Sequence, residues 1–381
     1  MSPPIIAQAD PRAAYLAARD EIDAAIGRVL AGGWYVLGQE VAAFEAEFAA
    51  FVGAAHGIGV GSGTDALALI LRGLDLGPGD AVATVAHTAV ATVAAIEMVG
   101  ATPLLVDIEP ATMTMDPADL AGLLERDRDR RIKAVLPVHL YGQPAELPAL
   151  AALAEAHGAA LIEDACQAHG AALGGRQVGS FGRAAAWSLY PTKNLGALGD
   201  GGIVTTDDAA LAERLRALRQ YGWHRRYVSD AVGVNSRLDE LQAAILRVKL
   251  PRLAAGNARR RAIAARYDLA LAGGPIAPPA LRPGAQHVYH QYVLRCPDRE
   301  AVQAALQAAG IGTGIHYPVP VHRQPAYAGR IGLGPAQCRA SERAAAEVLS
   351  LPIHPELTEA EVERVAAALE ALGTLAALRR G

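Results

Sequence analysis

The chain has 381 residues, 52% of them hydrophobic and 19% charged, so it can bury a large core and is neither disordered nor collagen-like. Its 35 basic and 39 acidic residues give a formal net charge of −4, which argues against binding to nucleic acid. Three widely separated cysteines, no export signal and no membrane-spanning apolar stretch favour a cytoplasmic protein without disulfides, a metal site or a membrane partner.

Between residues 57 and 206, short β-branched segments alternate with Ala- and Leu-rich stretches, a pattern typical of α/β proteins with helices on both faces of a sheet. Strands are predicted at 57–60, 81–85, 103–106, 132–138, 159–163, 184–189 and 202–206. Helices are predicted between them at 64–73, 88–99, 117–126 and 145–157. We therefore expect a mostly parallel, seven-stranded sheet in a large domain.

The remainder of the chain predicts a smaller α+β domain. Helices are expected at 208–220 and 236–272, and the second ends at a Gly- and Pro-rich break over 273–279. Beyond the break we predict strands at 288–295 and 311–316, and helices at 299–309, 339–349 and 359–378. Residues 1–250 are assigned to an N-terminal arm and the large domain, and residues 251–381 to the small domain.

A glycine-rich turn, Gly59-Val60-Gly61-Ser62-Gly63-Thr64, lies between the first predicted strand and an apolar helix. Backbone N–H groups at such a helix N-terminus suit a phosphate group. An ordinary turn in which Ser62 or Thr64 caps the helix is the alternative. The turn matches neither the P-loop nor the dinucleotide fingerprint, which gives little support to ATP or NAD.

Two polar runs follow later strands. Asp164 lies at the end of a buried strand, where α/β sheets bind ligands, although a structural cap is the alternative. Lys193 follows another strand in a Gly-rich run, where burial can lower its pKa and make the amine a nucleophile; a solvated surface lysine is the alternative. A phosphate cradle, a carboxylate and a lysine in this order are the groups that pyridoxal phosphate requires.

Over nearly its whole length the chain resembles the nucleotide-sugar aminotransferases of the DegT/DnrJ/EryC1/StrS family. The resemblance is carried by the runs at 63–67, 163–170, 190–196, 233–243, 316–320 and 324–327. It implies an aspartate aminotransferase-like fold, known as fold type I. It also implies an enzyme that uses pyridoxal 5′-phosphate and passes through pyridoxamine phosphate.

The resemblance implies a role for each matching residue. Lys193 would form the covalent imine with pyridoxal phosphate and later move protons, Asp164 would pair with the pyridine nitrogen, and Gln167 would contact the phenolic oxygen. The phosphate would be held by Gly63, Thr64 and Ser188, and by Asn235 of the neighbouring subunit. A homodimer with shared active sites is therefore expected.

The implied reaction transfers an amino group from L-glutamate to a nucleotide-linked keto sugar. The segments around 80–110 and 221–229 are most similar to members that act at C3 of dTDP-3-keto-6-deoxyhexoses. Amination at C4, a keto-inositol substrate and a non-enzymatic regulatory role are the alternatives. Candidate substrate residues, each of which could equally be a surface or packing residue, are Arg225, Arg226, Tyr227, His316, Tyr317, His322 and Tyr327.

Three positions leave questions open. Many relatives place an aromatic residue over the cofactor ring where this chain has Ala89, so stacking could come from His87 or be absent. Cys166 stands where relatives often have alanine, and a small packed side chain is the simpler interpretation than a reactive thiol. His169 could be catalytic or could simply pack behind the site.

Overall fold

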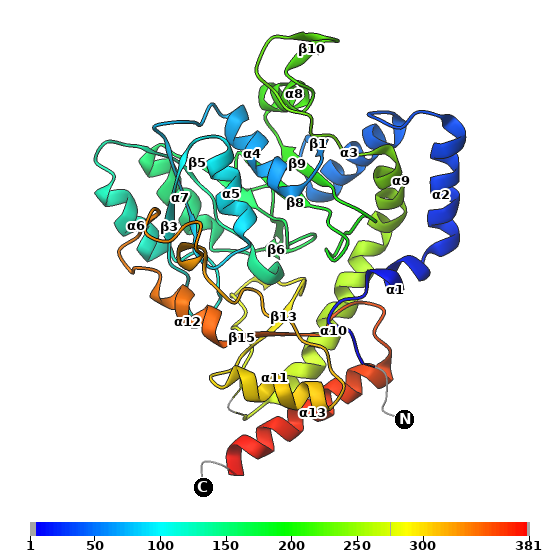
Figure 1. Cartoon of the computed structure of the whole chain (residues 1–381), viewed down its shortest axis with the longest axis vertical. Helices are drawn as coiled ribbons and strands as arrows, with labels where there is room; N and C mark the ends of the chain where they lie inside the picture. Colours follow the sequence, from blue (N-terminus) through cyan, green and yellow to red (C-terminus); the bar gives the residue numbers. More distant parts are fainter. Residues whose placement is uncertain (1–4, 275, 379–381) are drawn as a thin grey trace.

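The computed structural model describes residues 5–274 and 276–378. A large sheet with helices on both faces forms the upper part of Figure 1, and the C-terminal elements gather at its lower end. Within the described residues, no helix is both long and apolar enough to cross a membrane.

The central sheet contains eight strands in the order β1-β9-β8-β5-β4-β2-β3-β14. They are β1 (His56–Val60), β2 (Ala81–Val85), β3 (Thr102–Val106), β4 (Ile132–Val135), β5 (Ala160–Asp164), β8 (Ala184–Ser188), β9 (Gly202–Thr206) and β14 (Gly332–Leu333). The sheet is mainly parallel, and β9 runs antiparallel to both of its neighbours. All seven predicted strands are confirmed. The eighth, β14, was not predicted because its two residues carry no recognisable strand pattern.

Helices bury both faces of the sheet, which explains why its strands read as continuous apolar runs. On one face, α4 (Gly63–Gly73), α5 (Val90–Met98) and α8 (Ala209–Leu218) pack in a core that includes Val82 of β2. On the other, α3 (Gln39–Val52), α6 (Pro117–Arg126), α7 (Leu147–His157) and α9 (Glu240–Lys249) pack with Ala83. Successive residues of a strand thus enter opposite cores.

Three N-terminal helices had not been predicted: α1 (Pro11–Leu16), α2 (Arg19–Gly32) and α3. Both α2 and α3 pack against α9. The carboxylate of Glu240 accepts hydrogen bonds from the backbone N–H groups of Gly38, Glu40 and Val41, at 2.7, 3.0 and 2.9 Å. It caps the N-terminus of α3 from a distant part of the sequence.

The predicted helix over 236–272 is wrong as a single element. A 3₁₀ turn, Leu250–Arg252, separates α9 from α10 (Leu253–Leu271), because Pro251 cannot supply the backbone N–H that a continuous α-helix needs. The predicted helix over 339–349 is wrong at its end: α12 covers Arg339–Glu347, and Val348–Leu351 forms β15.

The predicted strand over 311–316 is also wrong. This segment forms only isolated bridges, Ile6 with Ile311 and Gly314 with Ser350. The strand predicted over 288–295 is shorter, β13 (Tyr292–Arg295), and pairs antiparallel with β15. The predicted α11 (Arg299–Ala308) and α13 (Glu359–Leu378) are confirmed.

The C-terminal lobe has its own apolar core, which α10, α11 and α13 form with β13, β15 and the N-terminal residue Ile6. The remaining strands are short: β6 (Ala172–Leu173), β7 (Arg176–Gln177) and β12 (Ala285–Gln286) form one small sheet. The pair β10 (Trp223–Arg225) and β11 (Val228–Ser229) forms a hairpin that projects at the top of Figure 1.

Candidate active site

A cavity of about 230 Å³ lies where the parallel strands β5 and β8 end and α4 begins. This edge is where open α/β sheets bind ligands. The cavity brings together five residues that the sequence analysis assigned to a cofactor site: Gly63, Thr64, Asp164, Gln167 and Ser188, with Lys193 at its wall.

Lys193 lies on the loop after β8, and its backbone N–H donates to the carbonyl oxygen of Tyr190 at 2.8 Å. Its side chain lines the cavity together with Asp164 and Cys166. Burial lowers the pKa of the Lys193 ammonium group, while Cys166 and Asp164 act in the opposite direction. More of the side chain is therefore present as the neutral amine, the form that attacks a carbonyl carbon.

Asp164 is the last residue of β5 and is buried. Its Oδ2 accepts a hydrogen bond of 2.8 Å from the hydroxyl of Thr92, and its Oδ1 accepts one of 3.2 Å from the backbone N–H of Cys166. These two bonds fix the orientation of the carboxylate and leave it capacity for a protonated nitrogen in the cavity. Burial raises the pKa of the Cys166 thiol well above its usual value, so this side chain is an inert wall.

The amide of Gln167 has a defined orientation. Its Oε1 accepts a hydrogen bond of 2.8 Å from the backbone N–H of Tyr141, and its Nε2 donates to the hydroxyl of Tyr317 at 3.1 Å. Since the oxygen is already paired and one N–H is bonded to Tyr317, the amide has its second N–H to offer to the cavity. Tyr317 comes from the C-terminal lobe, so the predicted His316-Tyr317 pair does reach this site.

The first turn of α4 approaches β8 very closely at Gly63. A Cβ atom at this position would lie 2.8 Å from Cβ of Ser188 and 2.9 Å from Sγ of Cys166. The hydroxyl of Ser62 caps the helix by accepting from the N–H of Asp65 at 3.1 Å. Glycine therefore brings the helix N-terminus, which favours an anion, directly against Ser188.

These groups fit pyridoxal phosphate. The amine of Lys193 suits its aldehyde, Asp164 suits a protonated pyridine nitrogen, and the amide of Gln167 suits the ring oxygen. The N-terminus of α4 and Ser188 suit the phosphate group. A side chain at position 63 would occupy the region next to Ser188 and Cys166, so glycine keeps that region open.

Tyr141 and Thr92 hold Gln167 and Asp164 in place, and the sequence analysis missed both of them. Tyr141 is buried and has a φ of 61°, an uncommon conformation for a residue with a side chain. Its hydroxyl lies 2.7 Å from Nε2 of His87 and donates to the carbonyl oxygen of His316. Tyr141 lies in a polar run, 139–143, directly after the predicted strand 132–138, and this position at a strand end was the feature of the sequence that could have identified it.

The structure places His87, Ala89 and His169, the residues whose relation to the cofactor ring the sequence left open. His87 faces Tyr141 and does not line the cavity, whereas Ala89 does. Of these two side chains, Ala89 is therefore the one at the cavity wall. His169 is fully buried beside Phe48 and Trp187, and burial lowers its pKa to about 3. The structure supports a packing role for His169.

Four predicted residues lie away from the cavity of their own chain. Arg226 and Tyr227 are in the β10–β11 hairpin, where the guanidinium group lies 4.8 Å from the centre of the exposed Tyr227 ring. Arg225 belongs to the same hairpin, and Asn235 is exposed and bridges to Gln220. None of these lines the cavity that contains Lys193.

His322 and Tyr327 also lie outside the cavity. Nε2 of the buried His322 is 2.9 Å from Oε1 of Glu342 on α12. Tyr327 packs on a small apolar cluster that includes Val321, and the guanidinium group of Arg330 lies 5.4 Å from its ring centre. These contacts agree with the packing alternative for both residues, and their assignment to the substrate stays a prediction.

Comparisons with known proteins agree with this arrangement. Residues 17–370 match the DegT/DnrJ/EryC1/StrS aminotransferase family. The chain is 51% identical to the erythromycin biosynthesis sensory transduction protein EryC1 of Saccharopolyspora erythraea, over 95% of this chain and 98% of that protein. It is 49% identical to the dTDP-3-amino-3,4,6-trideoxy-alpha-D-glucose transaminase of Streptomyces venezuelae, over 93% of each chain.

Two further matches extend the comparison. A UDP-N-acetyl-3-dehydro-alpha-D-glucosamine 3-aminotransferase of Acidithiobacillus ferrooxidans is 45% identical, over 95% of this chain and 96% of that protein. The crystal structure of S. venezuelae DesV in complex with a ketimine intermediate is 47% identical and superimposes with a TM-score of 0.93. It covers 97% of this chain and 99% of that chain.

Proposed function

The chain belongs to the DegT/DnrJ/EryC1/StrS aminotransferase family, and on that premise we propose that it aminates C3 of a dTDP-linked 3-keto-6-deoxyhexose with pyridoxal phosphate as cofactor. L-glutamate is the proposed amino donor. The observation that carries this proposal is the convergence of Lys193, Asp164 and Gln167 on one cavity at the carboxyl edge of the sheet.

The names of the relatives support position 3 of the sugar. The dTDP-sugar relative is named a 3-amino-sugar transaminase, and the UDP-sugar relative a 3-aminotransferase. Both are named for the same ring carbon although their nucleotides differ. Higher identity to the dTDP-sugar enzyme favours a dTDP-linked substrate here.

Each residue at the cavity has a role in the proposed reaction. When bound, pyridoxal phosphate supplies an aldehyde for the amino group and a protonated ring that withdraws electrons from the reacting carbon. Asp164 holds the proton on the ring nitrogen, and its own position is fixed by Thr92. The second N–H of Gln167 stabilises the ring oxygen, and Tyr141 holds the amide in that direction.

Lys193 is the proposed nucleophile and proton carrier. Its amine must be neutral to bond to the aldehyde and to remove a proton from the donor carbon, and burial favours that form. In the first half of the reaction the lysine would pass that proton to the aldehyde-derived carbon of the cofactor, and in the second half it would take a proton from the same carbon and deliver it to the sugar carbon. His316 and Tyr317 border the same region from the C-terminal lobe and are proposed to contact the sugar.

The proposal includes a homodimer in which each subunit contributes to the other's site. Exposed aromatic side chains, among them Trp34 at 68% and Tyr35 at 50%, line a groove of about 640 Å³ that Arg226 also lines, and Tyr227 next to Arg226 is 73% exposed. A second copy of the chain over this face would bury these rings. It would also explain why Asn235, Arg226 and Tyr227 lie outside their own cavity. We propose that this dimer acts in the cytoplasm, with 1–250 holding the cofactor and 251–381 closing on the sugar.

A regulatory role without catalysis is the competing proposal, because the relative that is 51% identical is named a sensory transduction protein. The complete set of Lys193, Asp164 and Gln167 favours an enzyme. An assay with L-glutamate and dTDP-, UDP- and GDP-linked keto sugars separates these proposals, with the aminated carbon read by NMR. Amination at C3 of the dTDP sugar is expected. Amination only at C4, turnover of a keto-inositol, or no turnover of any substrate would contradict it.

A further inference from the structure

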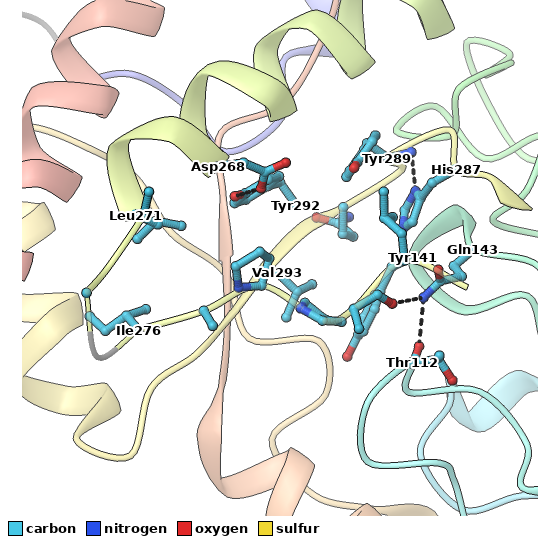
Figure 2. A pocket seen from close by; sticks show the side chains of 18 of the residues that line it. Thr112, Tyr141, Gln143, Asp268, Leu271, Ile276, His287, Tyr289, Tyr292 and Val293 are labelled. Atoms are coloured by element: carbon cyan, nitrogen blue, oxygen red, sulfur yellow. Dashed lines mark hydrogen bonds between the residues drawn. The ribbon is translucent and has the colours of Figure 1, made fainter. Parts of the chain in front are cut away.

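A second cavity, of about 410 Å³, lies between the C-terminal lobe and the sheet domain (Figure 2). We call it the seam cavity. Asp268 and Leu271 at the end of α10 and Tyr292 and Val293 of β13 form one wall, and Tyr141 and Thr112 lie on the opposite side. It shares no lining residue with the cavity of Lys193, and the proposed reaction makes no use of it.

The described wall of the seam cavity has one carboxyl group and no basic partner for it; burial raises the pKa of Asp268, and the hydrogen bond from Tyr292 acts in the opposite direction. Among the described residues that line it, Asp268 is the only acid and there is no lysine or arginine. The hydroxyl of Tyr292 donates to Oδ1 of Asp268 at 2.6 Å, and this bond holds the carboxylate in place. His287 cannot act as the counterion, because burial lowers its pKa to about 3 and keeps it neutral near pH 7. A cationic ligand would compensate the charge of Asp268.

Flat aromatic surfaces stand next to Asp268. The ring of His287 stacks on Tyr289 with centroids 4.1 Å apart, and the rings of Tyr289 and Tyr292 are 6.0 Å apart and nearly parallel. Burial and the charge of Asp268 raise the pKa of Tyr289 to about 12, so its hydroxyl remains a neutral donor. Aromatic faces beside a carboxylate are the combination that binds organic cations.

The walls of the seam cavity are fixed by hydrogen bonds. Gln143 donates from Nε2 to the carbonyl oxygens of Thr112 and Ala280, both at 3.1 Å, and accepts from the N–H of Arg282 at 2.9 Å. The loop over 276–281 is thereby tied to the sheet domain, as the dashed bonds at Gln143 in Figure 2 illustrate. The polar atoms of Gln143 are therefore paired within the protein. Among the lining residues, Asp268 is the group that can form an ion pair with a ligand.

We propose that the seam cavity is a second binding site, separate from the catalytic one, that takes a small organic ammonium compound. Its volume falls in the range of ordinary small-molecule sites. The ammonium group would pair with Asp268 and lie beside the partly exposed ring of Tyr289, while the buried Tyr292 holds the carboxylate in place. Neutral or anionic compounds of the same size would lack the ion pair and bind more weakly.

Calorimetric titration of the cofactor-loaded protein tests this proposal with three sugars of similar size. D-Glucosamine is cationic, N-acetyl-D-glucosamine is neutral and D-glucuronate is anionic. Glucosamine is expected to bind saturably, and the other two at least ~10-fold more weakly, because they lose a charge-assisted hydrogen bond. Asp268→Asn, which keeps a hydrogen bond to Tyr292, is expected to weaken glucosamine by ~10-fold or more.

A second variant tests the same site in case Asp268→Asn impairs folding. Ala277 is exposed at the mouth of the cavity, and Ala277→Phe would fill that space while leaving Asp268 intact. It is expected to weaken glucosamine binding and to leave the unfolding temperature nearly unchanged. The proposal is overturned if glucosamine shows no saturable binding to the wild type, or if it binds no better than N-acetyl-D-glucosamine. Equal glucosamine affinity in both variants and the wild type would overturn it as well.

Discussion

Oε1 of Gln167 accepts a hydrogen bond of 2.8 Å from the backbone N–H of Tyr141, and this contact determines which end of the amide faces the cavity. Tyr141 can offer that N–H because its backbone adopts a φ of 61° in the turn after β4. A residue in an uncommon conformation thus orients a donor for the cofactor.

Gln167→Glu keeps an acceptor for Tyr141 but replaces the N–H donor by a negative charge. The added charge favours the protonated form of the bound cofactor, so the pH at which its visible absorption changes is expected to rise. An absorbance titration measures this shift. Gln307→Glu, which adds the same charge on the exposed face of α11, is the control and should leave the titration unchanged. An unchanged midpoint in Gln167→Glu would contradict the assigned contact.

Gly63→Ala tests the close approach of α4 and β8. The new Cβ would meet Ser188 and Cys166 at 2.8 and 2.9 Å, so the helix must shift. We expect the free energy of unfolding to fall by about 1–3 kcal/mol, together with weaker binding of pyridoxal phosphate. Gly27→Ala, in the exposed interior of α2 with open space around it, should instead stabilise by about 0.5–1 kcal/mol. Equal effects of the two substitutions would refute the steric argument.

His169 is expected to contribute to acid sensitivity. Its pKa is about 3 in the folded protein and near 6.5 when unfolded, so the unfolded chain binds the additional proton and stability falls as pH drops from 6.5 toward 3. His169→Leu removes this proton uptake. Between pH 7 and ~5 the variant should lose about 2 kcal/mol less unfolding free energy than the wild type. Chemical denaturation at both pH values measures the difference, and parallel losses would contradict a buried neutral histidine.

Hybrid dimers test whether Asn235 serves the neighbouring subunit. A hybrid of one Lys193→Ala subunit and one Asn235→Ala subunit would contain one site with both defects and one site with neither. The purified hybrid is therefore expected to regain turnover that both parent homodimers have lost or reduced. If Asn235 served its own subunit, every site would carry one defect and the hybrid would show no recovery.

Much of the fold could be predicted from the sequence because the sheet is buried on both faces. Strands such as 81–85 are buried at every position, with Thr84 as the one polar residue in that strand, and the residues assigned to the cofactor follow such strands directly. Their chemistry is therefore visible as polar runs such as Glu163 to Gly170. The predicted set of Asp164, Gln167 and Lys193 meets in one cavity for this reason.

The remaining features depend on contacts between distant parts of the chain. Glu240 caps α3 across about 200 residues, and β14 is a strand only because it lies beside β3. The role of Tyr141 depends on one backbone angle, which residue type does not reveal. The candidate substrate residues do not lie together in one chain, because His322 and Tyr327 pack beside α12 and Val321 while Tyr227 lies on an exposed hairpin.

The covalent bond between Lys193 and pyridoxal phosphate is the most direct test of the proposed chemistry. Borohydride reduction of the cofactor-loaded protein, followed by peptide mass mapping, is expected to place a single phosphopyridoxyl group on Lys193, and Lys193→Ala should carry none. A modification on any other lysine, or no modification of a protein that retains aminotransferase activity, would contradict the account.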